Sequence, residues 1–227
     1  MNIAIIPARK NSIRIKNKNK KLFFKKPIIE YSIIEAKKTK LFDYIFVSTD
    51  CNEIANISKK AGANVLKRSS RLAQNEVGIV EVVKDSVFKI KNKKINPKYI
   101  CCIFPAAPLI EKKKILEGFN KIKKNKYSFV FSASKANLEI FRLFSLTTKK
   151  KIKLLFNKSL FNKKINKSLF FDAGQFYWAK VNKWMTEKTV FSSKASIIEI
   201  DRTKVQDINN LDDWKFAEFL FKSNKKN

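Results

Sequence analysis

A basic loop follows the first apolar stretch of the chain and holds residue types that bind phosphate. The segment IIPARKNSIRIKNKN, residues 5–19, carries six such polar side chains: Arg9, Ser12, Arg14, Lys16, Lys18 and Asn19. If the backbone N–H groups of this turn point inward, they and these side chains form a nest for a triphosphate. The G-x-x-x-x-G-K-[ST] pattern of a P-loop is absent. From composition alone, a solvated basic turn remains the alternative.

A second polar cluster lies inside the aromatic stretch FFDAGQFYWAK, residues 170–180. A strand over 175–178 would put two polar-tipped side chains on one face and two aromatic ones on the other, Gln175 and Tyr177 against Phe176 and Trp178. Gly174 lets the backbone approach a ligand closely, and Asp172 can accept from a hydroxyl or an amide. The stretch therefore predicts a strand that delivers polar groups to a pocket.

The chain has no histidine, which excludes histidine-dependent triads, histidine-ligated metals and imidazole acid–base chemistry. Catalysis would have to rest on Arg, Lys, Asp and Glu, or on a metal held by oxygen ligands. Cys51, Cys101 and Cys102 show neither a disulfide framework nor a zinc spacing. We expect them to be inert core thiols.

The formal net charge of +31 suggests a nucleic-acid partner. Only six of the 50 basic residues are arginine, although arginine is the side chain that phosphate and base recognition favours. The lysines are spread along the whole chain beside abundant Asn, Ile and Phe, as AT-rich codons would produce. We interpret the charge as surface charge that arose by sequence drift and that attracts anionic substrates. Nucleic-acid binding is the rival hypothesis.

Strand-like and helix-like segments alternate around these clusters. Strands are predicted at 2–6, 44–50, 64–68, 99–104, 128–134 and 196–200, and helices at 26–38, 76–90, 111–124, 181–187 and 211–221. Another helix should begin after Asp50, which with Glu53 matches a capping box, and end at Gly62. Such alternation predicts a three-layer α/β domain with a mainly parallel sheet, whose ligands bind beyond the carboxyl ends of the strands.

Residues 136–170 depart from this pattern and are rich in Lys, Asn and Phe. We expect a lid or a protruding arm here, within a single domain that spans 1–227, and a frayed tail over 222–227. No apolar run approaches the roughly 20 residues of a membrane span, and the first residues lack the order of a signal peptide. A cytoplasmic protein without a membrane partner is the expectation.

Five motifs then occur in an order typical of one family. They are PAR…S…KN after the first strand, FVSTD (46–50), Arg68 with Leu72 and Ala73, FPAAPLI (104–110) and VQDIN…LDDW (205–214). In this order the chain resembles, over nearly its whole length, the sugar-acid cytidylyltransferases that make CMP-activated sialic acids. DAGQFYW (172–178) is similar to the pseudaminic acid branch of that family.

The resemblance implies a Rossmann-like nucleotidyltransferase fold and a homodimer in which the 136–170 arm reaches across to the partner. The implied reaction joins the anomeric hydroxyl of a nine-carbon sugar acid to the α-phosphate of CTP, with Mg²⁺ assisting the departure of pyrophosphate. Such a displacement needs alignment and charge neutralisation more than covalent chemistry, which suits a chain without histidine.

The resemblance also assigns residues. It implies nucleotide binding by six of them, Ala8, Arg9, Ser12, Lys18, Asn19 and Arg68, with the 48–50 turn on the nucleotide side. Arg9, Lys18 and Asp207 would be catalytic, and Asp207 would hold Mg²⁺ with Asn209 beside it. The sugar acid would contact Arg142, Asp172, Gln175 and Tyr177.

Several positions depart from the family pattern. Lys10 and Asn11 stand where glycine is common, and Ile13 replaces a basic residue. Asn209 occupies the second aspartate position of D-x-D, which removes a charge from the metal site. An inactive CMP-sugar-binding relic is therefore one alternative. Another is the same reaction on N-acetylneuraminic acid, legionaminic acid or Kdo.

Overall fold

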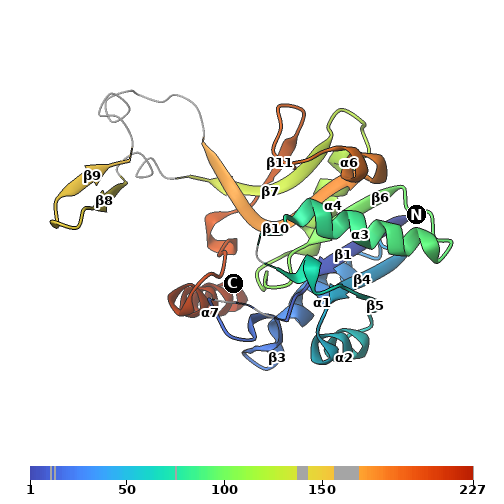
Figure 1. Ribbon diagram of the computed structural model, residues 1–227, viewed down its shortest axis with the longest axis horizontal. Helices are drawn as coiled ribbons and strands as arrows, with labels where there is room; N and C mark the ends of the chain where they lie inside the picture. Colours follow the sequence, from blue (N-terminus) through green and yellow to red (C-terminus); the bar gives the residue numbers. More distant parts are fainter. Residues whose placement is uncertain (11, 13, 75, 137–142, 156–168, 227) are drawn as a thin grey trace.

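A seven-stranded sheet in the order β11-β7-β10-β6-β1-β4-β5 forms the centre of the molecule (Figure 1). The computed structural model describes residues 1–227 apart from 11, 13, 75, 137–142, 156–168 and 227. The sheet strands are β1 (Asn2–Pro7), β4 (Tyr44–Thr49), β5 (Asn64–Lys67), β6 (Tyr99–Ile103), β7 (Phe129–Lys135), β10 (Phe170–Lys180) and β11 (Ser196–Glu199). Only β10 is antiparallel to its neighbours. The predicted mainly parallel sheet is confirmed.

Helices cover both faces of the sheet, which gives the predicted three layers (Figure 1). One face packs on α1 (Ile28–Lys38), α2 (Asn52–Lys60) and α4 (Lys112–Ile122), and the other on α3 (Ile79–Asn92) and α6 (Val181–Thr186). The last helix, α7 (Leu211–Lys226), packs beside the sheet against the short β2–β3 hairpin (Leu22–Phe23 and Lys26–Pro27). Because side chains alternate along a strand, each strand contributes to the cores on both faces of the sheet. Cys101 packs in the core beneath α1, α2 and α4, and Cys102 packs in the core beneath α3 and α6.

The three cysteines are free thiols, and all of them are buried. Burial raises the pKa of the Cys101 thiol and of the Cys102 thiol in strand β6. The expectation of core thiols is confirmed.

Trp178 of β10 forms the centre of the core beneath α4. Its side chain is 0% exposed, stacks on Phe42 and donates its indole N–H to the Ile115 carbonyl at 3.1 Å. Gly118 makes room for it, because a Cβ at that position would come within 2.7 Å of the indole. Phe176 and Trp178 both belong to this core.

Three local expectations were wrong. Asp50 does not cap α2, because its carboxylate accepts instead from the Lys10 backbone N–H at 2.7 Å and so anchors the loop after β1. Glu53 pairs with Lys20 rather than completing a capping box. The last helix does not fray after residue 221 but continues to Lys226. Gly62 does end α2 as predicted, with a left-handed φ of 88°.

The segment predicted as an excursion contains a small hairpin that stands away from the sheet (Figure 1). Its strands are β8 (Phe144–Leu146) and β9 (Ile152–Leu154), and its apolar side chains are exposed: 56% for Phe144, 66% for Leu146 and 64% for Ile152. The rest of that segment, including Arg142, lies outside the described residues. Along the described chain, no helix has the length and apolar character needed to cross a bilayer.

Candidate active site

A cavity of about 300 Å³ opens at the carboxyl ends of the central strands. Strand β1 lies between β4 and β6, so the order of the strands reverses at this point of the sheet. Open α/β sheets bind ligands at such a reversal. Its charged side chains are four cations and one carboxylate: Arg9, Arg14, Lys18, Arg68 and Asp207. Ser12, Asn19 and Gly174 also line it. The cavity therefore brings together residues from both predicted polar clusters and from the 205–214 motif.

The loop after β1 places Lys18 inside this cavity. Asn17 adopts a left-handed φ of 59°, which turns the chain into a short 3-10 helix at Lys18–Lys20. The Lys18 ammonium donates to the Ile208 carbonyl at 2.7 Å. Burial lowers the pKa of Lys18, an effect that the nearby Asp207 carboxylate partly opposes. Lys18 is thus a desolvated cation held beside the candidate metal ligand.

Asn19 has an unusual hydrogen-bonding state. Its side-chain N–H donates to the Arg9 carbonyl at 3.0 Å, and the residue is only 4% exposed. Its Oδ1 is buried without a hydrogen-bond partner among the described residues. A buried acceptor without a partner is costly, so this oxygen is available to a donor on a ligand.

Arg68 lies at the end of β5 and is fixed from β4. Its guanidinium donates to the Ser48 hydroxyl at 3.2 Å and to the Ser48 carbonyl at 2.6 Å. Burial lowers the pKa of Arg68 to about 10, although Asp50 counteracts this effect. Ala8 is buried and does not line the cavity, and its backbone N–H donates to the same Ser48 carbonyl. The FVSTD motif therefore supports the arginine that faces the cavity.

Asp207 and Asn209 lie side by side before α7. The Asn209 amide N–H donates to Asp207 Oδ2 at 2.8 Å, while the Asp207 side chain lies beside Gly174. Asp213 accepts from the backbone N–H groups of Asn209 and Asn210. It therefore acts as an acid at the N-terminus of α7. The described residues contain no cluster of three or more potential metal-ligating His, Cys, Asp or Glu side chains. A single carboxylate in the lining of a cavity with four cations fits Mg²⁺, which takes few protein ligands and completes its shell with phosphate and water.

The DAGQFYW stretch does not form a simple alternating strand. The pairing of β10 with β7 shifts register between Asp172 and Tyr177, and Gly174 adopts a left-handed φ of 60°. Gln175 is 3% exposed and donates its amide N–H to the Lys204 carbonyl at 2.7 Å. Tyr177 instead packs in the core beneath α3. The expected pairing of Gln175 with Tyr177 on one face is therefore not found.

Asp172 connects Tyr177 to the cavity. Its carboxylate accepts from the Tyr177 hydroxyl and, at 3.0 Å, from the Gly174 backbone N–H. Burial raises the pKa of Asp172, an effect that these two hydrogen bonds oppose. Asp172 and Gly174 thus form a tight turn next to Asp207, and the left-handed φ of Gly174 favours glycine at that position.

A second cavity of about 480 Å³ lies on the α3 side of the sheet. Tyr177 lines it, and Ile79 lines both cavities. The other lining residues come from the start of α3 and the loop after α6: Gly78, Val80, Glu81, Lys84, Lys188, Thr189, Val190 and Phe191. None of these was predicted as a site residue, because their sequence signals were those of an ordinary amphipathic helix and loop.

The chain is similar to known cytidylyltransferases. The chain is 30% identical to the pseudaminic acid cytidylyltransferase of Campylobacter jejuni subsp. jejuni serotype O:2 over 225 residues, which is 98% of this chain and 97% of that protein. It is 29% identical to the N-acylneuraminate cytidylyltransferase of Escherichia coli O18:K1:H7, over 60% of this chain and 32% of that protein.

The fold also matches solved structures. CMP:2-keto-3-deoxy-manno-octonic acid synthetase, solved in complex with CTP, superposes with a TM-score of 0.73 over 98% of this chain and 99% of that one, at 11% identity. The family model described as "Cytidylyltransferase" matches residues 3–218. This chain belongs to the cytidylyltransferase family.

Proposed function

We propose that this enzyme transfers CMP from CTP to the anomeric hydroxyl of a nonulosonic acid, with pseudaminic acid as its substrate, and releases pyrophosphate. The observation that carries the proposal is the first cavity, where Arg9, Arg14, Lys18 and Arg68 surround a space beside the Asp207 carboxylate. Such a cavity suits a polyphosphate with a bound cation. The full-length similarity to pseudaminic acid cytidylyltransferases supports the choice of sugar acid.

Catalysis in this proposal consists of alignment and charge neutralisation. The sugar hydroxyl attacks the α-phosphorus while the bond to the pyrophosphate oxygen breaks, so negative charge grows on the departing group. Arg9 and Lys18 neutralise that charge from fixed positions, since the Ile208 carbonyl holds the Lys18 ammonium. Arg68 holds the nucleotide side. Preorganised cations of this kind require no histidine.

Asp207 would hold Mg²⁺ through its carboxylate, with triphosphate oxygens and water as the other ligands. The ion would supply further neutralisation of the triphosphate. Asn209 orients the Asp207 carboxylate through its 2.8 Å hydrogen bond. Gly174 lines this side of the cavity beside the Asp207 side chain, and its left-handed φ of 60° favours glycine there.

On the sugar side we propose roles for Asp172 and Tyr177, which are joined by a hydrogen bond next to Asp207. Gln175 would act by holding the turn, because its amide N–H bonds to the Lys204 carbonyl. A contact from Arg142 to the acid stays a prediction, as that residue lies outside the described part of the chain.

The test is pyrophosphate release from CTP and Mg²⁺ in the presence of pseudaminic acid, legionaminic acid, N-acetylneuraminic acid or Kdo, each alone. We expect release with pseudaminic acid. Release with another acid alone would keep the reaction and overturn the substrate. Folded protein that releases nothing with any of the four acids would contradict the proposed activity and favour a binding-only relic.

Asn209→Asp is expected to lower the Mg²⁺ concentration needed for half-maximal activity by several-fold. The change adds a second carboxylate beside Asp207, and Mg²⁺ favours one or two such ligands. Titrating Mg²⁺ at saturating CTP measures the effect, with Asp212→Asn as the control, because that carboxylate at the start of α7 is exposed. An unchanged or higher Mg²⁺ requirement would show that residue 209 does not adjoin the metal.

A homodimer held by the β8–β9 hairpin is also proposed. An isolated two-stranded hairpin is marginal in water, and this one exposes Phe144, Leu146 and Ile152. Packing on a second copy would cover them. Leu146→Lys with Ile152→Lys should shift the mass measured by analytical ultracentrifugation from dimer to monomer, and Leu22→Lys, an exposed site on another hairpin, should not. A wild-type monomer at micromolar concentration would refute the proposal.

A further inference from the structure

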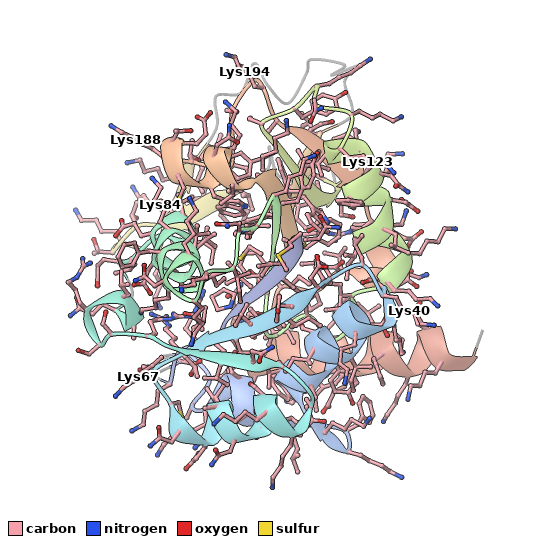
Figure 2. The ribbon with its side chains drawn as sticks, turned by 90° about the vertical axis from the view of Figure 1, so that its right-hand side faces the viewer. Lys40, Lys67, Lys84, Lys123, Lys188 and Lys194 are labelled. Atoms are coloured by element: carbon pink, nitrogen blue, oxygen red, sulfur yellow. The ribbon has the colours of Figure 1, made fainter. Side chains whose placement is uncertain are left out.

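Exposed lysines lie on many elements of the fold and therefore mark no single part of its described surface. Figure 2 shows Lys40 after α1, Lys123 after α4 and Lys194 before β11 at places well apart from one another. Buried polar side chains are fewer, and such groups are almost always hydrogen-bonded. The partner of a buried hydroxyl therefore indicates what that hydroxyl holds in place.

A serine that is 0% exposed occurs in each of three helices, at Ser32 in α1, Ser58 in α2 and Ser86 in α3. The hydroxyls of Ser58 and Ser86 donate to a carbonyl in the preceding turn of their own helix, at 2.7 and 2.8 Å. The Ser32 hydroxyl instead donates to the Phe104 carbonyl at 2.7 Å, across 72 residues of sequence. Of the three, Ser32 is the one that connects its helix to another part of the fold.

The surroundings of Ser32 would suit an apolar side chain. Ile29, Ile33 and Ala36 on the same face of α1 are buried in the core beneath that helix. Alanine would fit this setting and favours a helix interior more than serine does. In such a low-dielectric environment the hydrogen bond of a hydroxyl is strengthened. The serine is therefore explained by the bond that it makes to Phe104.

Phe104 lines the first cavity at the end of β6, and it is held from three directions. The Ser32 hydroxyl donates to its carbonyl, and its own backbone N–H donates to the Gln175 carbonyl at 2.9 Å. Its ring packs edge-on against Tyr177, with 5.0 Å between the ring centroids, and Tyr177 donates to Asp172. Ser32 thus connects through Phe104 to the proposed sugar side of the cavity.

We propose that Ser32 is a positioning residue, which fixes the 104–107 loop against the 172–175 turn so that the sugar hydroxyl is aligned with the α-phosphate. The inference rests on the proposed function and adds a residue outside the cavity that controls this alignment. A displacement of about 1 Å far from the reacting atoms can cost about 10²-fold in rate. The proposed nucleotide contacts of Lys18 and Arg68 come from other loops, so Ser32 affects turnover rather than CTP binding.

The test compares Ser32→Ala with Ser58→Ala, a matched control that removes an equally buried helix hydroxyl bonded within its own helix. Calorimetry gives the affinity and the stoichiometry of CTP binding in the presence of Mg²⁺. Pyrophosphate release with pseudaminic acid then gives kcat and KM. An unchanged CTP stoichiometry shows that a lower kcat does not come from inactive protein.

A second readout follows the loop itself and does not depend on turnover. The backbone N–H groups of Phe104 and Ile110 are hydrogen-bonded, to the carbonyls of Gln175 and Ala107. Hydrogen–deuterium exchange of peptides that contain these two N–H groups therefore reports how often the loop opens.

We expect Ser32→Ala to lower kcat by roughly tenfold, to leave the Kd and stoichiometry of CTP unchanged, and to accelerate exchange in the 104–110 peptides. Ser58→Ala should behave as wild type in all of these measurements. Ser32→Cys keeps the volume of the side chain but donates more weakly, so its kcat should fall between those of wild type and the alanine variant. It also provides a second variant if Ser32→Ala does not fold.

Exchange at the wild-type rate in both Ser32 variants would show that the hydroxyl does not hold the loop. Faster exchange with an unchanged kcat would overturn the positioning role, and so would an equal loss of kcat in Ser58→Ala. Wild type that turns over no sugar acid would overturn the proposed function and with it the role in alignment, while the exchange rates would still decide whether Ser32 holds the loop.

Discussion

Replacing Lys18 with methionine is expected to lower kcat by roughly 10²–10³-fold, the loss seen when one preorganised group at a developing charge is removed. The ammonium is desolvated, bonded to the Ile208 carbonyl and close to Asp207. A water molecule in its place would therefore stabilise the developing negative charge less. Methionine has a similar length and removes a charge that burial disfavours. Because the substitution also leaves the Ile208 carbonyl without its donor, the free energy of unfolding should fall by no more than about 1–3 kcal/mol, which thermal unfolding can measure.

The pH dependence provides a second measure of the same residue. Activity needs the protonated ammonium, and burial lowers the Lys18 pKa below 10.5. As pH rises, kcat/KM should therefore begin to fall before that value. The kcat profile should extend to higher pH, because bound triphosphate stabilises the cation. Lys18→Arg keeps its charge and should lose the alkaline limb. A flat wild-type profile up to pH 10.5, or an active Lys18→Met, would contradict this role.

Trp178→Ala should destabilise the protein by about 3–5 kcal/mol, the range for removing a large buried aromatic side chain. The indole is 0% exposed, stacks on Phe42 at 5.4 Å between ring centroids and satisfies the Ile115 carbonyl. Gly118 has no side chain with which to fill the resulting space. Several partners would thus be lost at once.

Urea denaturation measures this loss as a lower midpoint with an unchanged m-value. Trp178→Phe serves as the comparison, because it keeps an aromatic ring while removing the indole N–H, and it should fall between wild type and alanine. A loss of less than about 0.5 kcal/mol for alanine, as at an ordinary surface position, would show that β10 does not anchor α4.

Periodic patterns predicted the layers and the position of the first cavity. The alternation of strands and helices indicates a parallel sheet, and the carboxyl ends of such strands meet at one edge. Arg9, Lys18, Arg68 and Asp207 are distant in sequence, yet the structure brings all four to that edge. The family motifs made this predictable residue by residue.

Other features depended on tertiary contacts that no local pattern contains. The residues around Asp50 match the sequence pattern of a helix N-cap. In the structure, however, its carboxylate accepts from the Lys10 backbone N–H of a different loop. The positive φ of Gly174 shifts the register of β10, so strict alternation could not place Gln175. Lys84 and Lys188 are two among many lysines in the sequence. Only the folding of α3 beside the 188–191 loop brings both of them to the second cavity.

The two neighbouring thiols at the middle of the sheet can report how often the folded protein opens. Cys101 and Cys102 are 0% exposed on a strand with a neighbour on each side, and their raised pKa disfavours the reactive thiolate. A reagent can reach them only when strands separate, so the alkylation rate counts excursions out of the native state. Ligands that fill the cavities at the ends of these strands should therefore slow the alkylation of Cys101 and Cys102, whether or not the ligands react.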